Sequence, residues 1–506
     1  MTRFEGLLTQ DRHDQSLLDQ VHPTDWVNPL PQSRYNLVVI GGGTAGLVTA
    51  AGAAGLGARV ALVERHLMGG DCLNFGCVPS KALIRSSRGV ADARSAGKLG
   101  VRRTEAAVAD FPAVMERLRS IRAGISRHDS VHRFSELGVD VFLGEGRFAG
   151  PDRIEVGDQI LRFSKAVIAT GARASVPPIP GLVEAGYLTN ETIFSLTELP
   201  ARLAIVGGGP IGCELAQAFS RLGSKVTLIE LEKRFLPRED PEAAELLKTV
   251  FVEEEIDLRL NTRLSRVENS ASEKRLVLES DGNVDSLDVD QILIGTGRSP
   301  NVAGLNLERA GVHYSTSGGI EVDDHLRTTN RRIFAAGDVV MQHQFTHAAD
   351  ASARIVIQNA LFLGRKKASR LVIPWCTYTS PEIAHVGLSE SESRVRGIEI
   401  RTFKTKLSSV DRAVLDGEER GFVKIHVGKR SDQILGATIV ATSAGDMISE
   451  VTLAIVGEIG LGSLASVIHP YPTQSEAIRR TADAYNRTRL TPTVKALFER
   501  WLKWTR

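Results

Sequence analysis

Two cysteines five positions apart, Cys72 and Cys77, are the side chains of this sequence whose type and spacing suit redox chemistry. Such a pair can cycle between a dithiol and a disulfide, and we expect the two thiols to reach each other across one helical turn. Gly76 allows a backbone or a flat ring to approach the pair closely. Lys81 falls on the same helical face as Cys77, where its charge would lower a thiolate pKa and stabilise a reduced ring.

The alternative interpretation is a pair of buried thiols without chemistry, or half of a metal site. A tetrathiolate zinc site would need all four cysteines of the chain, including Cys213 and Cys376. We interpret those two as ordinary buried thiols. Four cysteines are too few for a disulfide-stapled secreted fold, so the close pair indicates catalytic or metal chemistry in a reducing compartment.

A glycine-rich turn typical of nucleotide binding precedes the cysteine pair. An apolar run of strand type over residues 37–40 leads into Gly41, Gly43 and Gly46, then into a helix and a second strand that ends in Glu64. Gly41 would make the tight turn, Gly43 would let the backbone approach a pyrophosphate, and Gly46 would let the helix pack on the strand. The helix N-terminus would face the phosphates, and Glu64 would hold ribose hydroxyls.

The same arrangement recurs 166 residues later. A strand over residues 203–206 precedes Gly207, Gly209 and Gly212, a helix follows, and the next strand ends in Glu230. One glycine motif alone is weak evidence, because a tight packing turn has the same pattern. Two complete copies, each with its strand, helix and acid, predict that the protein binds two dinucleotides.

Composition places these motifs in an ordinary globular protein of about three domains. The chain has 506 residues, of which 42% are hydrophobic and 24% charged, and this composition excludes disordered and fibrous classes. Its formal net charge is only +2, which makes nucleic acid a poor partner. Residues 111–137 have the spacing of a helical insertion, and shorter strands and helices from about Leu371 indicate a separate α+β domain. The N-terminus lacks the apolar stretch of a signal peptide, so we expect a cytoplasmic protein.

From Tyr35 to about Asn486 the sequence resembles the FAD-dependent pyridine nucleotide–disulphide oxidoreductases. The resemblance implies an α/β fold with two Rossmann-like domains, one for FAD and one for NAD(P), and a C-terminal α+β dimerisation domain. The predicted boundaries are an N-terminal arm over 1–34, the FAD-binding domain over 35–175 and 301–370, the NAD(P)-binding domain over 176–300, the interface domain over 371–490 and an amphipathic tail over 491–506.

The resemblance also implies roles for individual residues. Cys72 would be the thiol that meets substrate, Cys77 the thiol that contacts the flavin, and Lys81 would pair with Glu214 beside the flavin. Electrons would pass from the nicotinamide through FAD to the cysteine pair and then to the substrate. The other residues that the resemblance assigns to the two cofactors are Thr170, Gly171, Asp338, Thr346, Ala349 and Gly297.

The segment around Tyr471 bears on the substrate. Disulfide-reducing members of the family carry a histidine base where this chain has Tyr471, with Glu476 five residues later. A phenol is a poor base at neutral pH, and His469 is displaced by two residues, although it remains a candidate base. Mercuric reductases place a tyrosine in such a segment, contributed by the partner subunit. Cys72 and Cys77 would then bind the soft ion Hg(II) transiently as substrate.

Several alternatives stay open. Characterised mercuric reductases carry a further cysteine pair near the C-terminus, whereas no cysteine follows Cys376. The substrate would otherwise be a small disulfide or a hypothiocyanite-type oxidant, and dihydrolipoamide dehydrogenase activity is disfavoured. A flavin-binding redox sensor without turnover is the non-enzyme alternative. Glu230 favours NADH as donor, with NADPH the alternative because Lys233 and Arg234 are close in sequence.

The tail from Thr493 combines an apolar face with basic residues. We favour the interpretation that this helix docks within a homodimer whose active site is shared between subunits. Contact with a membrane surface is the alternative.

Overall fold

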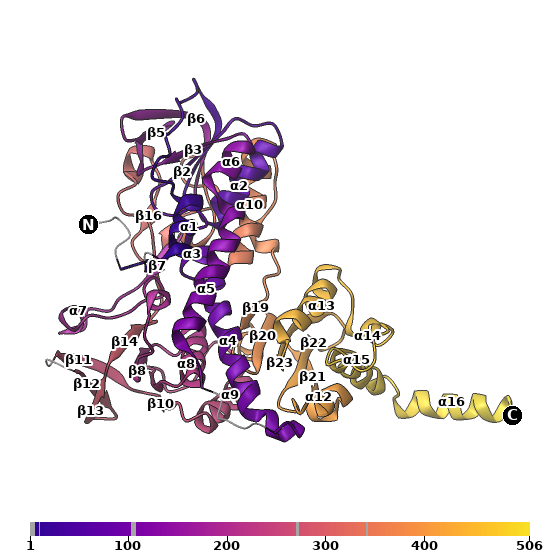
Figure 1. Cartoon of the computed structure of the whole chain (residues 1–506). Helices are drawn as coiled ribbons and strands as arrows, with labels where there is room; N and C mark the ends of the chain where they lie inside the picture. The colour runs from indigo at the N-terminus through magenta and orange to yellow at the C-terminus, as the bar shows by residue number, and fades with distance from the viewer. Residues whose placement is uncertain (1–5, 10, 103–107, 270–272, 341–342) are drawn as a thin grey trace. The chain divides into compact units, whose positions relative to one another are not determined.

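The computed structural model describes residues 6–9, 11–102, 108–269, 273–340 and 343–506. Two compact units divide the chain. The first comprises Met1–Leu231 and Glu255–Leu371, and the second comprises Glu232–Glu254 and Val372–Arg506. Figure 1 shows their elements along the chain. Residues 232–254 belong to the predicted NAD(P)-binding stretch, yet they pack with the C-terminal unit.

A seven-stranded mixed sheet forms the first half of the first unit. Its strand order is β3-β2-β1-β6-β5-β4, with β18 also paired to β6. The strands are β1 (Tyr35–Ile40), β2 (Val60–Glu64), β3 (Val139–Leu143), β4 (Gly146–Gly150), β5 (Arg153–Val156), β6 (Gln159–Ile168) and β18 (Ile333–Ala335). Strand β1 is the centre of the parallel part, between β2 and β6.

The sequence of β1 explains why it lies inside the sheet. Its apolar residues are buried on both faces: Leu37 and Val39 join one core cluster, and Val38 and Ile40 join another. Such a continuous apolar run is typical of a parallel strand covered on both sides. Helices α2 (Thr44–Gly55) and α10 (Thr346–Leu361) contribute to the first of these clusters.

The second nucleotide motif lies in a four-stranded parallel sheet of order β10-β9-β8-β14. Its strands are β8 (Arg202–Val206), β9 (Lys225–Ile229), β10 (Asp257–Arg259) and β14 (Gln291–Ile294), and α8 (Pro210–Leu222) follows β8. A three-stranded antiparallel sheet of β11 (Arg263–Asn269), β12 (Lys274–Ser280) and β13 (Asn283–Val289) adjoins it. Two short pairs complete the strands of this unit: β7 (Ala172–Ala174) with β15 (Arg298–Pro300), and β16 (Tyr314–Ser315) with β17 (Gly319–Ile320).

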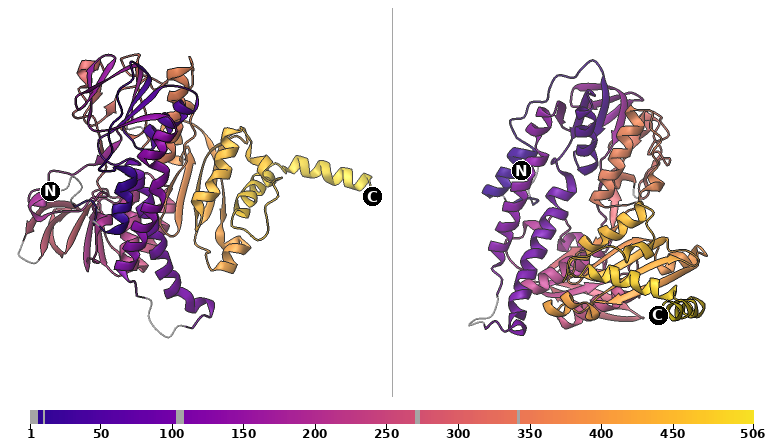
Figure 2. Two further views of the ribbon diagram at one scale, coloured as in Figure 1. Left: turned by 45° about the horizontal axis from the view of Figure 1, so that its top comes forward. Right: turned by 90° about the vertical axis from the view of Figure 1, so that its right-hand side faces the viewer.

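The same unit contains further helices, which Figure 1 and Figure 2 show from three sides. They are α1 (Arg12–Val21), α3 (Gly70–Asn74), α4 (Cys77–Ser95), α5 (Phe111–Ser126), α6 (Val131–Glu136) and the short α7 (Leu182–Ala185). The predicted helical insertion over 111–137 therefore forms α5 and α6. Part of the predicted N-terminal arm is the helix α1, whose Leu17 and Val21 are fully buried in the core.

The second unit is built on a five-stranded antiparallel sheet of order β19-β20-β23-β22-β21. The strands are β19 (Trp375–Thr377), β20 (Glu382–Gly387), β21 (Ile400–Lys406), β22 (Phe422–Gly428) and β23 (Ile434–Ala441). Its helices are α9 (Pro241–Glu253), α11 (Glu390–Val395), α12 (Asp411–Asp416), α13 (Ala444–Val456), α14 (Leu461–Leu464), α15 (Glu476–Thr488) and α16 (Pro492–Trp504). This composition matches the α+β character expected from Leu371 onward. Among the described residues, no helix combines the length and the apolar character needed to cross a bilayer.

Candidate functional site

The first glycine turn has a backbone that only glycine permits. Gly41 has a φ of +108°, and a Cβ there would lie 2.3 Å from the carbonyl oxygen of Ala169. A Cβ on Gly46 would lie 1.7 Å from the carbonyl oxygen of Gly41. Gly43, the N-cap of α2, is different, because a Cβ there would meet only the Cα of Gly70, at 3.7 Å. The α2 N-terminus is therefore open to an incoming phosphate.

The second turn repeats this geometry. Gly207 has a φ of +109°, and a Cβ there would lie 2.4 Å from the carbonyl oxygen of Gly295. A Cβ on Gly212 would lie 2.0 Å from the carbonyl oxygen of Gly207, whereas one on Gly209 would meet nothing within 4 Å. The chain thus builds the same phosphate-accessible turn twice.

In each nucleotide motif, the glutamate at the end of the second strand accepts a hydrogen bond from the glycine turn. Glu64 Oε2 accepts a hydrogen bond of 2.5 Å from the backbone N–H of Gly42, and Glu230 Oε2 accepts one of 2.6 Å from Gly208. Burial raises the pKa of Glu64. Both carboxylates therefore stand where the ribose of a bound dinucleotide is expected.

The two cysteines face each other, though not across one helical turn. Cys72 lies in the short helix α3 and Cys77 begins α4, with Phe75 and Gly76 outside both helices. In one continuous helix, side chains five residues apart would point about 140° away from each other. The break between α3 and α4 turns the thiols together, and they share a hydrogen bond. Both are free thiols, with Cys77 exposed and Cys72 half-buried.

The surroundings of Cys77 favour its thiolate. The hydrogen bond from Cys72 lowers the pKa of Cys77 to about 6, and Thr346 and Lys81 act in the same direction. Cys77 Sγ lies 3.4 Å from Thr346 Oγ1, and the two residues are the first of α4 and of α10. The positive ends of two helix dipoles thus meet at this sulfur. The same hydrogen bond raises the pKa of Cys72, so that one thiol is acidic and its neighbour stays protonated.

Lys81 joins the cysteine helix to the helix of the second nucleotide motif. Its Nζ lies 2.7 Å from Glu214 Oε2, an ion pair between α4 and α8. The Glu214 side chain is only 6% exposed, whereas that of Lys81 is 37% exposed. The lysine charge is therefore fixed one helical turn from Cys77 and stays accessible.

Two family models account for most of the chain. The pyridine nucleotide-disulphide oxidoreductase model matches residues 35–353, and the dimerisation-domain model of the same family matches residues 373–482. The chain belongs to this family. It is an enzyme of the pyridine nucleotide-disulphide oxidoreductases, which use FAD and NAD(P)H, and its dimerisation domain supports a homodimer.

Relatives within the family differ in what their names say they act on. A mercuric reductase of Bacillus cereus is 36% identical over 88% of this chain and 70% of its own length. A dihydrolipoyl dehydrogenase of Bacillus subtilis is 33% identical over 89% of this chain and 98% of its own. Among solved structures, the HOCl-induced flavoprotein disulfide reductase RclA of Escherichia coli has a TM-score of 0.80 and 30% sequence identity to this chain. The match covers 89% of this chain and 99% of RclA. A Cu(II) complex of RclA has also been solved.

The open turn at Gly43 fits FAD in this oxidoreductase, and the residues predicted on the flavin side lie in the same unit. Thr170 Oγ1 donates to the carbonyl of Asn301 at 2.8 Å, and Gly171 has a φ of +69°. Ala349 is buried in α10, where its Cβ lies 3.6 Å from the position of a Cβ on Gly337.

Two further residues predicted to contact a cofactor, Gly297 and Asp338, lie next to Arg298. Gly297, with a φ of +118°, precedes Arg298, whose Nε lies 3.6 Å from Asp338 Oδ2. Burial raises the pKa of Asp338. Arg298 Nη1 also lies 3.2 Å from Asp71 Oδ2, beside Cys72. Sequence analysis assigned no role to Arg298 or Asp71, although Arg298 follows Gly297 in the Gly-Thr-Gly-Arg run.

A buried ion pair supports the redox motif from the N-terminal side. Arg122 Nη2 lies 2.5 Å from Asp14 Oδ1, and both side chains are 1% exposed. Arg122 Nη1 donates to the carbonyl of Asn74 at 2.9 Å, two residues after Cys72. The Met68 N–H also donates to the carbonyl of Val21 in α1 at 3.1 Å. Nothing in the local sequence signals this link, because Asp14 and Arg122 are 108 positions apart.

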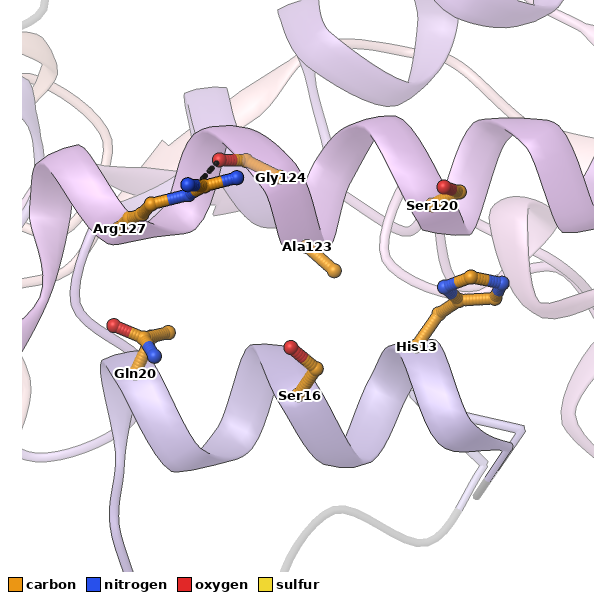
Figure 3. A pocket seen from close by; sticks show the side chains of 7 residues that line it. All are labelled: His13, Ser16, Gln20, Ser120, Ala123, Gly124 and Arg127. Atoms are coloured by element: carbon orange, nitrogen blue, oxygen red, sulfur yellow. Dashed lines mark hydrogen bonds between the residues drawn. The ribbon is translucent and has the colours of Figure 1, made fainter.

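A polar groove of about 460 Å³ lies between α1 and α5 and contains none of the predicted site residues. Figure 3 shows its seven lining residues, with side chains of the two helices facing each other across it and Arg127 donating to the carbonyl of Gly124. The groove belongs to the docking surface of α1. It is separate from the cysteine pair.

The substrate residues predicted near the C-terminus lie in the second unit. The Tyr471 hydroxyl donates to Asp411 at 2.9 Å, which raises the pKa of Tyr471, and the side chain is 71% exposed. His469 Nε2 lies 3.0 Å from Glu450 Oε1. Glu476 is buried and accepts from Arg479 at 2.7 Å.

The structure therefore gathers the predicted catalytic residues in two groups. Cys72, Cys77, Lys81 and Glu214 form one group in the first unit, next to the predicted cofactor residue Thr346. The segment from His469 to Glu476 belongs to the second unit. Among the described residues, no cluster of three or more histidine, cysteine or acidic side chains is arranged to hold a resident metal.

Proposed function

We propose that this oxidoreductase transfers electrons from NAD(P)H to a soft, thiol-reactive acceptor at Cys72 and Cys77, and that Hg(II) is that acceptor. The observation that carries the proposal is the hydrogen-bonded cysteine pair, in which Cys77 has a pKa of about 6 and Cys72 remains protonated. One ready thiolate beside one thiol suits an acceptor that binds sulfur. Overall, NAD(P)H and Hg²⁺ give NAD(P)⁺, H⁺ and Hg⁰, a transfer of two electrons.

The cofactor supplies the redox step, and the chain supplies position and charge. FAD, held at the Gly43 turn, would supply the two-electron redox chemistry that links the nicotinamide to the cysteine sulfurs. The open turns at Gly43 and Gly209 present backbone N–H groups for the two pyrophosphates. Lys81 places a positive charge one helical turn from Cys77, held by Glu214, and so favours negative charge at this site.

Cys72 would meet the acceptor. As the thiol of raised pKa it keeps its proton at neutral pH, and a soft metal ion displaces that proton on binding. We propose that Tyr471 and Glu476 complete this site from the partner subunit, as the family's dimerisation domain allows. Because its hydrogen bond to Asp411 raises its pKa, Tyr471 would act as a neutral ligand or proton donor, not as a base.

A disulfide substrate is less well supported. Reduction of a disulfide needs a group that protonates the leaving thiolate, and a phenol with a raised pKa is poorly matched to this exchange at neutral pH. His469, the displaced candidate base, is engaged by Glu450. The mercuric reductases among the relatives and the Cu(II) complex of RclA favour a metal ion as acceptor.

Anaerobic NADH oxidation by the FAD-loaded protein tests the proposal. Hg(II) in excess small thiol is compared with Cu(II), lipoamide, glutathione disulfide and hypothiocyanite. We expect sustained turnover with Hg(II) that Cys72→Ala abolishes, while Cys376→Ala, a change of a half-buried thiol in the second unit, leaves it intact. Fast turnover with another acceptor and none with Hg(II) would refute the mercury assignment. Flavin reduction by NADH without any acceptor turnover would favour a redox sensor.

A further inference from the structure

Helix α16 is a well-formed amphipathic helix that the redox site does not use. It runs over Pro492–Trp504, with Pro492 in its first turn and Thr491 as N-cap, whose side chain accepts from the backbone N–H of Val494. No residue of the helix is buried. A helix of 13 residues is marginal in water, so a surface that covers its apolar side would stabilise it.

Its apolar side is broad and strongly exposed. At about 100° per residue, the large apolar side chains from Val494 to Trp504 cover an arc of roughly 160°, with Ala496 outside it. A face of this width is one that a helix turns toward an apolar surface and away from water. Trp501 is 58% exposed and Trp504 76% exposed, and the other large members are Leu497, Phe498 and Leu502.

The opposite side is basic. Lys495, Arg500, Lys503 and Arg506 lie outside the apolar arc, and Glu499 is the one acid from Pro492 to Arg506. This segment therefore carries a formal charge of +3, whereas the whole chain carries +2. The segment therefore combines net positive charge with exposed aromatic side chains.

We propose that α16 lies in the interface of an anionic lipid bilayer, with its apolar arc among the acyl chains and its lysines and arginines at the phosphate level. A broad apolar face with tryptophan, phenylalanine and leucine, opposite a basic face, is the pattern that interfacial helices show. Tryptophan prefers the headgroup region, and each basic side chain gains from the negative surface potential.

A second copy of the chain is the competing occupant. The dimerisation-domain match ends at residue 482, ten residues before α16 begins, so the helix lies outside the segment that the family uses for dimerisation. A contact between two copies would cover the apolar face and leave the basic face without a partner of opposite charge. An anionic lipid surface would cover the apolar face with its acyl chains and pair the basic face with its phosphates.

Vesicle flotation of the full-length, FAD-loaded protein tests the proposal. Vesicles of phosphatidylcholine with about 30% phosphatidylglycerol are compared with pure phosphatidylcholine near neutral pH. We expect binding to the anionic vesicles, a blue shift of tryptophan emission, and loss of most binding between about 0.05 and 0.5 M salt. Equal flotation with both vesicles, or none with either, would overturn the proposal.

Substitutions on the basic face and on the apolar face of α16 distinguish how much each face contributes to vesicle binding. Lys495→Gln with Lys503→Gln should weaken binding roughly 25-fold, at about fivefold per charge. Lys495→Arg with Lys503→Arg should bind like the wild type. Phe498→Ser with Trp501→Ser should weaken binding at least ~10-fold. Flavin reduction by NADH should not change in any of them. If the Phe498→Ser, Trp501→Ser protein instead keeps its vesicle binding and loses its dimer, α16 is a subunit contact and the membrane proposal fails.

Discussion

Lys81 and Glu214 form an ion pair of 2.7 Å that ties the cysteine helix α4 to the nucleotide helix α8. Lys81 belongs to the cysteine motif and Glu214 to the second nucleotide motif, so the ion pair joins these two motifs at the redox site. The lysine lies one turn beyond Cys77, and its position depends on a carboxylate that is 133 residues away.

Removal of this lysine should slow electron transfer and destabilise the protein. Lys81→Met takes the partner from the buried carboxylate of Glu214 and the positive charge from the cysteine pair, so we expect slower flavin reduction by NADH. The free energy of unfolding should fall by about 1–3 kcal/mol. Stopped-flow absorbance and urea unfolding measure these effects. Lys429→Met breaks an exposed pair of 2.6 Å with Glu399 and is the matched control, with no change expected in either quantity.

The pH dependence of thiol reactivity should report the low pKa of Cys77. In the reduced protein, alkylation of Cys77 by iodoacetamide should rise with pH through an apparent pKa of about 6. Cys72→Ala removes the largest cause of this shift and should move the midpoint upward toward the ordinary thiol value near 9. Thr346→Val should shift it in the same direction by less. An unchanged midpoint in Cys72→Ala would contradict the hydrogen-bonded pair.

The same depressed pKa has a consequence for stability. A thiolate with a lower pKa in the folded state stabilises the fold above the unfolded value, and this contribution is lost as the pH falls through about 6. For the reduced protein, the difference in unfolding free energy between wild type and Cys77→Ser should therefore be larger near pH 9 than near pH 5. Urea unfolding at the two pH values measures it.

The buried ion pair of Asp14 and Arg122 should contribute far more to the free energy of unfolding than the exposed ion pair of Arg12 and Glu116. Asp14→Asn leaves the Arg122 charge buried without its carboxylate and should cost about 3–5 kcal/mol. Arg12→Met, in the same helix α1, breaks an exposed pair with Glu116 and should cost less than about 1 kcal/mol. Because Arg122 also holds the carbonyl of Asn74, Asp14→Asn should change the alkylation rate of Cys72, which Arg12→Met should not do.

Glu239 should make the second unit less stable at alkaline pH. Its carboxylate is buried, accepts from Trp375 Nε1 at 3.1 Å, and has a pKa raised to about 7 by burial. A raised folded-state pKa means that stability is highest below the unfolded value near 4.5 and declines as the pH rises to about 7. Glu239→Gln should therefore gain about 1–3 kcal/mol relative to wild type near pH 8 and little near pH 5. Equal differences at both pH values would show that Glu239 does not titrate in this range.

Glu230 should select the electron donor. Its carboxylate is fixed at the second glycine turn by Gly208, where it would accept ribose hydroxyls and repel a 2′-phosphate. Glu230→Arg should move the ratio of kcat/KM values from NADH toward NADPH. Glu230→Gln removes the negative charge without adding a positive one, so it should lose preference for NADH without a comparable gain for NADPH. Unchanged ratios in both variants would show that another residue reads the ribose.

The motifs of this protein could be predicted from its sequence because each is local. A strand, a glycine turn, a helix and an acid follow one another within about 25 residues in each nucleotide motif, and backbone sterics restrict Gly41 and Gly207 to glycine. The cysteine pair and Lys81 are similarly local. Family, fold class and cofactors follow from these patterns, and the family matches confirm them.

Only the tertiary structure decided which distant groups act on these motifs. Thr346 reaches Cys77 across 269 residues, and Arg122 reaches Asp14 and Asn74 from a helix in the insertion. The orientation of the thiols is also a tertiary result, because the break between α3 and α4 turns side chains together that one helix would point apart. A sequence pattern records neighbours along the chain. The pKa of Cys77 depends on neighbours in space: the break between α3 and α4 brings Cys72 to it, and the start of α10 brings Thr346.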